Sequence, residues 1–345
     1  MADTIDAAKL DEWMRRSVAG YRGPLAIAPI AGGQSNPTYA VTSPSGRYVL
    51  RRKPPGKLLP SAHAVDREFR VMQALRNTDV PVPRTYALCA DESVAGTMFY
   101  VMEHVAGRVF YDPRLLDLTR ADRQAMFADM NRVIAALHSI DPAAVCLGDF
   151  GRPGNYFARQ IARWSQQYKA SETETIEAMD RLIDWLPANI PPIGPKGDET
   201  TIVHGDFRAD NLIFHPTEPR VAAVLDWELS TLGHPLGDFA YHVMAWRLRP
   251  ELFRGLDGSD LAALGIPSES DYVAEYCRRR GLERIEHWEF YMVFVMFRLS
   301  AICQGIMGRV RDGTAKSAEA RESGSKARPL AELAWHQVEK MKSAA

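Results

Sequence analysis

The most informative part of the sequence spans residues 203–214 and reads VHGDFRADNLIF. A second short segment, residues 224–228, reads VLDWE. In both segments an apolar, strand-like run gives way to polar residues, which is a position suited to holding polar groups at a cleft. The oxygen-bearing side chains that stand out in them are Asp206, Asn211 and Asp226.

These three side chains match the needs of phosphoryl transfer. The γ-phosphoryl group must be held in line with an attacking hydroxyl, and its charge must be neutralised, usually by Mg²⁺. Because Mg²⁺ prefers hard oxygen ligands and keeps several waters, one carboxylate and one amide oxygen can suffice to hold it. A second carboxylate near the hydroxyl can accept the proton that the hydroxyl loses.

The sequence contains a spaced motif: His-x-Asp, then four residues and Asn, and later an Asp after an apolar strand. This motif is similar to the catalytic signature of protein-kinase-like phosphotransferases. The version here resembles the aminoglycoside phosphotransferase and choline kinase branch. The resemblance implies that Asp206 is the catalytic base and that Asn211 and Asp226 are metal ligands. It also implies that His204 braces the loop and that ATP and Mg²⁺ are the cofactors. We count Arg208 among the candidate catalytic residues.

The N-terminal part of the chain resembles the nucleotide-binding part of the same family. The candidate phosphate-binding loop, in which glycines let backbone N–H groups approach phosphates, comprises Gly32, Gly33, Gln34, Ser35 and Asn36. The family carries a lysine on the following strand, whereas this chain has Arg51, Arg52 and Lys53, and which of them faces the cleft is left open. Glu68 is the expected partner of that cation, with a solvated helix charge as the alternative.

Two further segments resemble the family. Residues 99–105, FYVMEHV, are similar to its hinge, so that the backbone of Glu103 to Val105 is expected to bind adenine. Residues 233–240, GHPLGDFA, match the segment that follows the metal-binding aspartate. There we expect Asp238 to act as a helix N-cap and loop brace rather than as a reactant.

Hydrophobic periodicity supplies a coarse secondary structure. It predicts helices over residues 7–19, 64–76, 126–137, 156–185 and 287–307. Strand-like runs occur at residues 38–41, 48–51 and 99–102, with a second pair at 201–203 and 221–225, and residues 309–326 are expected to form a surface loop or mobile lid. With the resemblance, this predicts an α+β, protein-kinase-like bilobal fold. A small antiparallel β-sheet lobe would span residues 1–104, and a larger, mainly helical lobe would span residues 105–345.

Composition narrows the classes of function. The 345 residues include 42 Lys and Arg against 43 Asp and Glu, a balance that argues against a nucleic-acid binder. The longest clean apolar run, residues 290–297, is far shorter than the ~20 residues of a membrane span, and the first ten residues lack an apolar signal core. Four well-separated cysteines predict buried free thiols in a reducing cytoplasm. A homodimer is left open.

The resemblance is sharpest around residues 150–168, which include FGRPGNY, and it points to the subgroup whose kinase-like domains are fused to acyl-CoA dehydrogenases. This implies an ATP-dependent kinase that phosphorylates the hydroxyl of a hydroxyacyl-CoA or related hydroxy acid. Residues 241–345 contain 16 Lys and Arg against 14 Asp and Glu, a balance that disfavours a polycationic acceptor. The alternatives are an aminoglycoside or amino-alcohol phosphotransferase, a nucleotide-binding pseudokinase, and a metal-dependent hydrolase.

Overall fold

The structure is a computed structural model that describes residues 5–30, 36–56, 63–192 and 198–344. Its contacts divide the chain into two compact units. The first unit contains residues 1–109, 143–147 and 211–230, and the second contains the rest. The first unit is therefore discontinuous, whereas the predicted lobes are continuous segments that meet after residue 104.

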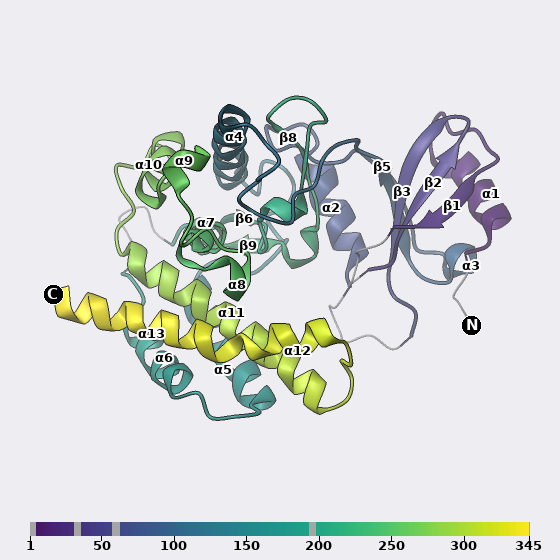
Figure 1. Cartoon of the computed structure of the whole chain (residues 1–345). Coiled ribbons are helices and arrows are strands. Elements are labelled where there is room, and N and C mark those ends of the chain that lie inside the picture. Colours follow the sequence, from purple (N-terminus) through teal and green to yellow (C-terminus); the bar gives the residue numbers. More distant parts are fainter. Residues whose placement is uncertain (1–4, 31–35, 57–62, 193–197, 345) are drawn as a thin grey trace. The chain divides into compact units, whose positions relative to one another are not determined.

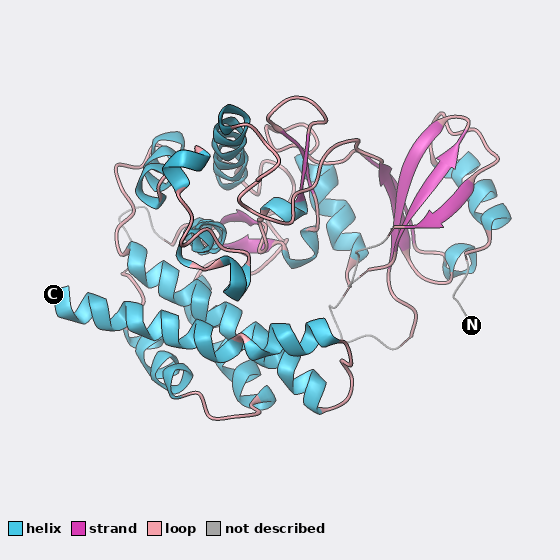
Figure 2. Cartoon of the chain, in the orientation of Figure 1, coloured by secondary structure: helices cyan, strands magenta, loops and turns pink. Residues whose placement is uncertain are grey.

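The first unit is built on a five-stranded antiparallel sheet (Figure 2). Its strand order is β1-β2-β3-β5-β4, with β1 Ala26–Pro29, β2 Thr38–Ser43, β3 Gly46–Arg52, β4 Thr85–Cys89 and β5 Phe99–Glu103. The predicted strands at 38–41, 48–51 and 99–102 are thus confirmed. Ser43 pairs with Gly46, so that a tight turn closes the β2–β3 hairpin. The sheet places Arg51, near the end of β3, opposite Tyr100, and it places Glu103, at the end of β5, opposite Tyr48.

Helices cover this sheet as their sequences predict. Helix α1, Ala7–Ser17, is capped by the Asp6 side chain and buries Leu10 and Met14 in the core of the first unit. Helix α2, Val65–Leu75, buries Val65, Val71, Met72 and Leu75, but it also buries the carboxylate of Glu68. A short helix, α3 Glu92–Ala95, leads into β5. The expected helices at 7–19 and 64–76 are therefore confirmed, each with somewhat shorter bounds.

A small hairpin completes the first unit. Strand β7, Leu212–Phe214, pairs with β8, Val221–Val224, and the short 3-10 helix η2, Trp227–Leu229, follows. The two strand-like segments predicted at 201–203 and 221–225 do not pair with each other. The first is β6, Thr201–Val203, of the second unit, and it pairs with β9, Thr231–Gly233. Sequence periodicity located these strands, but three or four residues carry no information about their partners.

The second unit is mainly helical (Figure 1). Its longer helices are α4 Arg120–His138, α5 Tyr156–Ser171, α6 Glu177–Ala188, α7 Pro235–Val243, α10 Glu269–Arg280, α11 Trp288–Arg311 and α13 Ala327–Ala344. Shorter pieces are α8 Pro250–Phe253, α9 Leu261–Leu264, α12 Ala318–Ser325 and the 3-10 helix η3 Met244–Arg247. The single helix expected over 156–185 is two helices. The expectation of a loop or lid over 309–326 is wrong, because α11 continues to Arg311 and α12 follows.

Helix α11 is the centre of the second core. Every residue from Phe290 to Phe297 is buried, and the helix packs against α5, α7, α12 and α13. Among the described residues α11 is the one helix long and apolar enough to cross a membrane, yet 78% of its most apolar window is buried inside the protein. This is the pattern of a core helix. One cysteine expectation is wrong: Cys89, Cys277 and Cys303 are buried thiols, but Cys146 is exposed.

Candidate functional site

Arg51 is the centre of a buried group of charges in the first unit. Its Nε lies 2.9 Å from Oε2 of Glu68, and its Nη2 lies 2.7 Å from Oδ1 of Asp226 and 3.7 Å from Oε2 of Glu228. Strand β3, helix α2 and the segment after β8 each contribute to this group, which we call the Arg51 cluster together with Asn36 and Tyr100. One guanidinium therefore faces three carboxylates.

Of the three neighbouring cations, strand alternation places Arg51 and Arg52 on opposite faces, and Lys53 lies beyond the end of β3. Arg52 is buried on the other side, where it donates to the carbonyl of Ala95 and to the hydroxyl of Tyr39. Lys53 lies 3.6 Å from Asp66 near the surface. Successive side chains of a strand point to opposite faces, and Arg51 is the one that lines the cavity described below. The structure thus answers the question that the sequence left open.

Glu68 is held from several directions. The amide of Asn36 donates to its Oε1 at 2.8 Å, and the hydroxyl of Tyr100 donates to its Oε2 at 3.0 Å. Burial raises the pKa of Glu68 to about 7, although the Arg51 guanidinium acts in the opposite direction. The alternative of a solvated helix charge is therefore wrong for Glu68. Arg67, on the same helix, donates to the carbonyl of Ser230 and ties α2 to the segment that carries Asp226.

The β7–β8 hairpin brings the two candidate metal ligands to the same end. Leu212 pairs with Val224, and the N–H of Leu225 donates to the carbonyl of Asn211, so that Asn211 lies across from Leu225 and beside Asp226. Asp226 has φ of +64°, the left-handed conformation that Asp tolerates better than most residues. Asn211 precedes a strand rather than following one, which corrects the expected placement after an apolar strand.

These oxygen atoms fit the chemistry of a divalent cation. Among residues 5–30, 36–56, 63–192 and 198–344, no group of three or more His, Cys, Asp or Glu is arranged to hold a metal ion. A cation here would depend on Asp226, the amide oxygen of Asn211, waters and substrate phosphates, which is the coordination that Mg²⁺ favours.

A cavity of about 340 Å³ adjoins the Arg51 cluster. Arg51, Glu68 and Asp226 line it, together with Glu103 and Val105 from the end of β5 and the segment beyond it. Its apolar walls come from Val49, Met72, Met102, Ile213 and Leu225. A volume of this size and a mainly apolar lining with a few convergent polar groups are typical of ligand sites. Of the predicted loop, Gly32, Gly33, Gln34 and Ser35 lie outside the described residues.

The second unit holds the other candidate residues on the loop after β6. Asp206 is partly buried, and its Oδ1 lies 2.9 Å from Nε of Arg208. The N–H of Asp206 donates to Nδ1 of the buried His204 at 3.2 Å. Tyr241, on α7, interacts with the carboxylate of Asp206, and burial together with that carboxylate raises the pKa of the Tyr241 hydroxyl. We call residues 204–210 the Asp206 loop.

Asp238 anchors the Asp206 loop from behind. Its Oδ2 accepts the N–H of His204 at 2.7 Å, and its Oδ1 accepts the N–H of Gly205 at 2.8 Å. Burial raises the pKa of Asp238, but the hydrogen bond from His138 and the contacts with His204 outweigh this, so that the net pKa is lowered. Asp238 is a loop brace as expected, but it is not the helix N-cap. That position belongs to His234, whose side chain accepts the N–H of Leu236.

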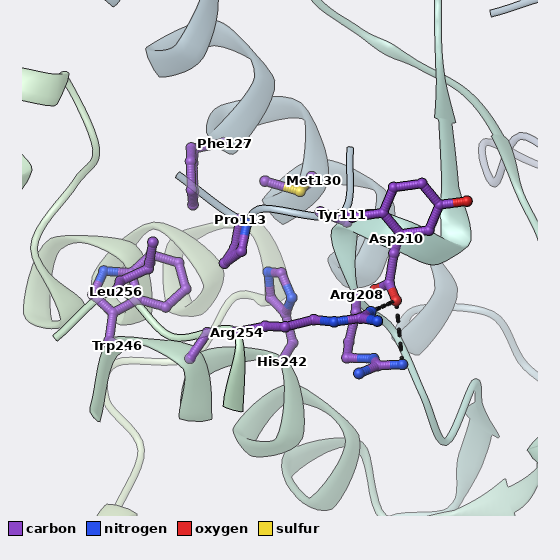
Figure 3. A pocket seen from close by; sticks show the side chains of 12 residues that line it. Tyr111, Pro113, Phe127, Met130, Arg208, Asp210, His242, Trp246, Arg254 and Leu256 are labelled. Carbon is purple, nitrogen blue, oxygen red and sulfur yellow. Dashed lines mark hydrogen bonds and ion pairs between the residues drawn. The ribbon is translucent and has the colours of Figure 1, made fainter. Parts of the chain in front are cut away.

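A second cavity, of about 50 Å³, opens beside the Asp206 loop (Figure 3). The carboxylate of Asp210 lies between the guanidinium groups of Arg208 and Arg254, with which it forms ion pairs. The remaining lining is apolar or aromatic and includes Tyr111, Pro113, Phe127, Met130, Trp246 and Leu256. Burial lowers the pKa of His242, which also lines the cavity, to about 4, so that this imidazole is neutral at pH 7. The ionised groups of this lining, two arginines and one aspartate, leave a net positive charge.

Sequence reasoning missed several of these residues. Glu228 follows Asp226 by two positions in the quoted VLDWE segment, so its proximity could have been inferred. Asp210 lies within the motif itself, whereas Arg254 and Tyr241 reach the loop from segments far along the chain. No local pattern marks those two residues.

The sequence profile of the phosphotransferase enzyme family, APH, matches residues 26–275. The chain belongs to this family. It is 48% identical over 315 residues to acyl-CoA dehydrogenase family member 10 of Mus musculus, a match that covers 91% of this chain and 29% of that protein. It is 40% identical over 334 residues to family member 11 of Homo sapiens, covering 95% and 42% respectively. The chain thus spans less than half the length of these relatives.

Solved structures agree with this assignment. A crystal structure from Ralstonia eutropha, assigned provisionally to the aminoglycoside phosphotransferases, is 55% identical and superimposes with a TM-score of 0.91 over 98% of this chain and 99% of its own. The aminoglycoside phosphotransferase APH(4)-Ia, in a complex with ADP and hygromycin B, is 14% identical with a TM-score of 0.61, over 95% and 98%. The predicted kinase-like α+β fold and the family resemblance are confirmed, and the chain is a phosphotransferase of kinase-like fold.

Proposed function

We propose that this chain transfers the γ-phosphoryl group of ATP to the hydroxyl group of a hydroxyacyl-CoA. The observation that carries this proposal is the cavity beside the Asp206 loop, whose lining is apolar and cationic and includes Arg208, the ion-pair partner of Asp206. The relatives support the acyl part, because they are acyl-CoA dehydrogenase family members in which this chain matches only one portion. A kinase portion and a dehydrogenase portion of one polypeptide are expected to act on the same class of thioester.

The first unit would bind the nucleotide. Arg51 can reach phosphate oxygens with its guanidinium, a group that binds phosphate bidentately. The N–H of Glu103 already donates to the carbonyl of Arg84, so adenine would be held by the carbonyl of Glu103 and the N–H of Val105. Within the described part of the chain, the N–H of Val105 donates no hydrogen bond, so it is available to a ligand. Asn211 and Asp226 would hold Mg²⁺, which supplies neutralisation of the phosphate charge when bound.

The second unit would carry the chemical step. Asp206 accepts the proton of the acceptor hydroxyl while the oxygen of that hydroxyl bonds to the γ-phosphorus and the bond to the leaving ADP oxygen breaks. Arg208 would hold the carboxylate of Asp206 in place through their ion pair at 2.9 Å. General-base catalysis of this kind contributes about 10²–10⁴-fold to a rate.

The lining of the cavity supports one class of acceptor over another. An aminoglycoside carries several positive charges and is expected to need an acidic pocket. Here the two arginines exceed the single aspartate, and the walls are aromatic or aliphatic. An acceptor with an apolar chain and an anionic carrier, such as an acyl-CoA, complements this surface. The amino-alcohol alternative gains no support from these residues.

A panel of acceptors tests the proposal. ADP release would be measured with the purified chain, ATP, Mg²⁺ and, in turn, 3- and 4-hydroxyacyl-CoA thioesters, aminoglycosides, choline and homoserine. We expect turnover with a hydroxyacyl-CoA and formation of its phosphate ester by mass spectrometry. ADP release with only an aminoglycoside or an amino alcohol would reject the acceptor. Absence of transfer to every acceptor, with nucleotide binding intact, would instead favour the pseudokinase alternative.

Two variants test whether the acceptor binds in the cavity beside the Asp206 loop. Arg254→Met should raise KM for the acyl-CoA roughly tenfold and leave KM for ATP unchanged, because it removes a cation at the acceptor side only. Arg249→Met is the matched control. Arg249 lies at the other end of α8 from Arg254, is exposed, and pairs with Asp257. It does not line the cavity. Equal KM values in the two variants would contradict an anionic acceptor at this cavity.

A further inference from the structure

A buried arginine stands behind the Asp206 loop. Arg298 lies on α11, directly after the apolar run Phe290 to Phe297, and only 6% of its surface is exposed. Among the described residues no carboxylate forms an ion pair with it. Removing a guanidinium from water without a counter-charge costs several kcal/mol of folding free energy. An apolar residue at this position would continue the buried apolar face of α11 without that cost. The position therefore calls for an explanation other than packing.

The contacts of Arg298 lead to Asp206 through the backbone. Its Nη2 donates to the carbonyl of Gly205 at 2.9 Å. That carbonyl belongs to the peptide group whose N–H is the amide of Asp206, and this N–H donates to His204. The peptide group immediately before Asp206 is thus held at its oxygen by Arg298 and at its nitrogen by His204. Gly205 has φ of +86°, so the chain turns here in a conformation that a side chain would disfavour.

A second route leads through an aromatic ring. The guanidinium carbon of Arg298 lies 5.0 Å from the ring centroid of Tyr241 and 5.7 Å from that of Trp164. Both distances are within the range of a cation–π contact. The Tyr241 hydroxyl interacts with the carboxylate of Asp206. Arg298 therefore holds the peptide that carries Asp206 and packs against the ring of Tyr241, whose hydroxyl interacts electrostatically with that carboxylate.

We propose that Arg298 is a positioning residue for phosphoryl transfer, which sets the direction of the Asp206 carboxylate through the Gly205 carbonyl and the Tyr241 ring. This proposal rests on the proposed function, because it assumes that Asp206 is the catalytic base. Asp238 supplies the opposite charge from the other side, because it accepts the N–H of the same Gly205 whose carbonyl Arg298 binds. Two buried charges of opposite sign thereby hold the loop without touching each other.

The test compares Arg298→Met and Arg298→Lys with a matched control, Arg123→Met. Arg123 is also buried, and it donates only to the backbone carbonyls of residues 115, 116, 118 and 264, away from the Asp206 loop. With a hydroxyacyl-CoA as acceptor, Arg298→Met should lower kcat by roughly 10- to 100-fold, since small misplacements of a reacting group have effects of this size. KM for ATP should change by less than about twofold, and Arg298→Lys should recover part of kcat.

A second measurement does not depend on the acceptor. Hydrogen exchange of a peptide covering residues 203–208 should be faster in Arg298→Met than in the wild type, and unchanged in Arg123→Met. The proposal is overturned if kcat, corrected for the folded fraction, falls no further in Arg298→Met than in Arg123→Met, or if exchange in this peptide is unchanged. Should the wild type phosphorylate none of the acceptors, the proposed function fails, and the exchange result alone decides the role of Arg298.

Discussion

The Arg51 cluster of the first unit and the Asp206 loop of the second unit both concentrate acidic and basic side chains, but in different proportions. The Arg51 cluster places a single guanidinium among three carboxylates. Around the Asp206 loop, Arg208 and Arg254 share Asp206 and Asp210, and Arg298 and Asp238 hold the loop from behind, so that arginines and carboxylates are equal in number. The two regions therefore differ in their electrostatic balance.

The difference indicates a division of labour. An excess of carboxylates is neutralised by a cation. Such a cation would arrive as the Mg²⁺ that accompanies a bound nucleotide. In the lining of the cavity beside the Asp206 loop, Arg208 and Arg254 outnumber Asp210, and this excess of positive charge would stabilise an anionic acceptor and the transferring phosphoryl group. We therefore expect substitutions in the Arg51 cluster to affect nucleotide binding and those at the Asp206 loop to affect the chemical step.

The largest effect is expected at Asp206. Asp206→Asn keeps the shape of the side chain but removes the proposed base and the negative partner of Arg208. We expect kcat to fall by about 10²–10⁴-fold, while ADP and AMP-PNP bind with wild-type affinity in calorimetric titrations. A rate within a few-fold of the wild type would remove Asp206 from the role of base. Loss of nucleotide affinity would show that the two regions do not divide the work in this way.

A smaller effect, of the opposite kind, is expected at Arg51. Arg51→Met should raise KM for ATP by roughly 10- to 100-fold, because a charge-assisted contact to phosphate is lost. Arg52→Met is the matched control on the same strand, since Arg52 is buried on the other face and bonds to Ala95 and Tyr39. It should lower the melting temperature and leave KM for ATP unchanged. Equal KM values in the two variants would show that Arg51 does not bind the nucleotide.

How far the sequence predicts this molecule depends on whether a feature is local. The motif around Asp206 and Asn211 and the strand before Arg51 are local, and their positions were predicted. The choice between Arg51 and Arg52 could not be predicted. Strand alternation places the two side chains on opposite faces of the sheet, but it does not determine which face borders the cavity. The neighbours Arg254 and Tyr241 come from distant segments, and only the folded chain brings them to the loop.

Arg298 is an intermediate case. The sequence shows a charged residue that closes an eight-residue apolar run, which is unusual for a buried helix. That pattern marks the position as exceptional but does not name the Gly205 carbonyl as its partner. Likewise, residues 309–326 are polar and rich in small side chains, and this composition predicted a loop where the structure has the end of α11 and then α12. Packing against α11 outweighs the weak helix propensity of that segment.

The smallest expected effect is a pH dependence of stability that arises from Glu68. Its pKa is about 7 in the folded protein against an ordinary value of 4.5, because it is buried. Between these two pH values the unfolded chain has released this proton while the folded chain still holds it. The contribution of Glu68 to the free energy of unfolding is therefore greatest at low pH and is lost as the pH rises toward 7.

Glu68→Gln removes this titration while it keeps a side chain of the same shape beside Tyr100 and Asn36. The difference in melting temperature between wild type and variant should shift by several degrees between about pH 5 and pH 7, in the direction that disfavours the wild type at the higher pH. Glu12→Gln is the control, because Glu12 is exposed on α1 and pairs only with Arg16. A constant difference across this range would show that Glu68 is ionised throughout, and that Arg51 outweighs burial within the Arg51 cluster.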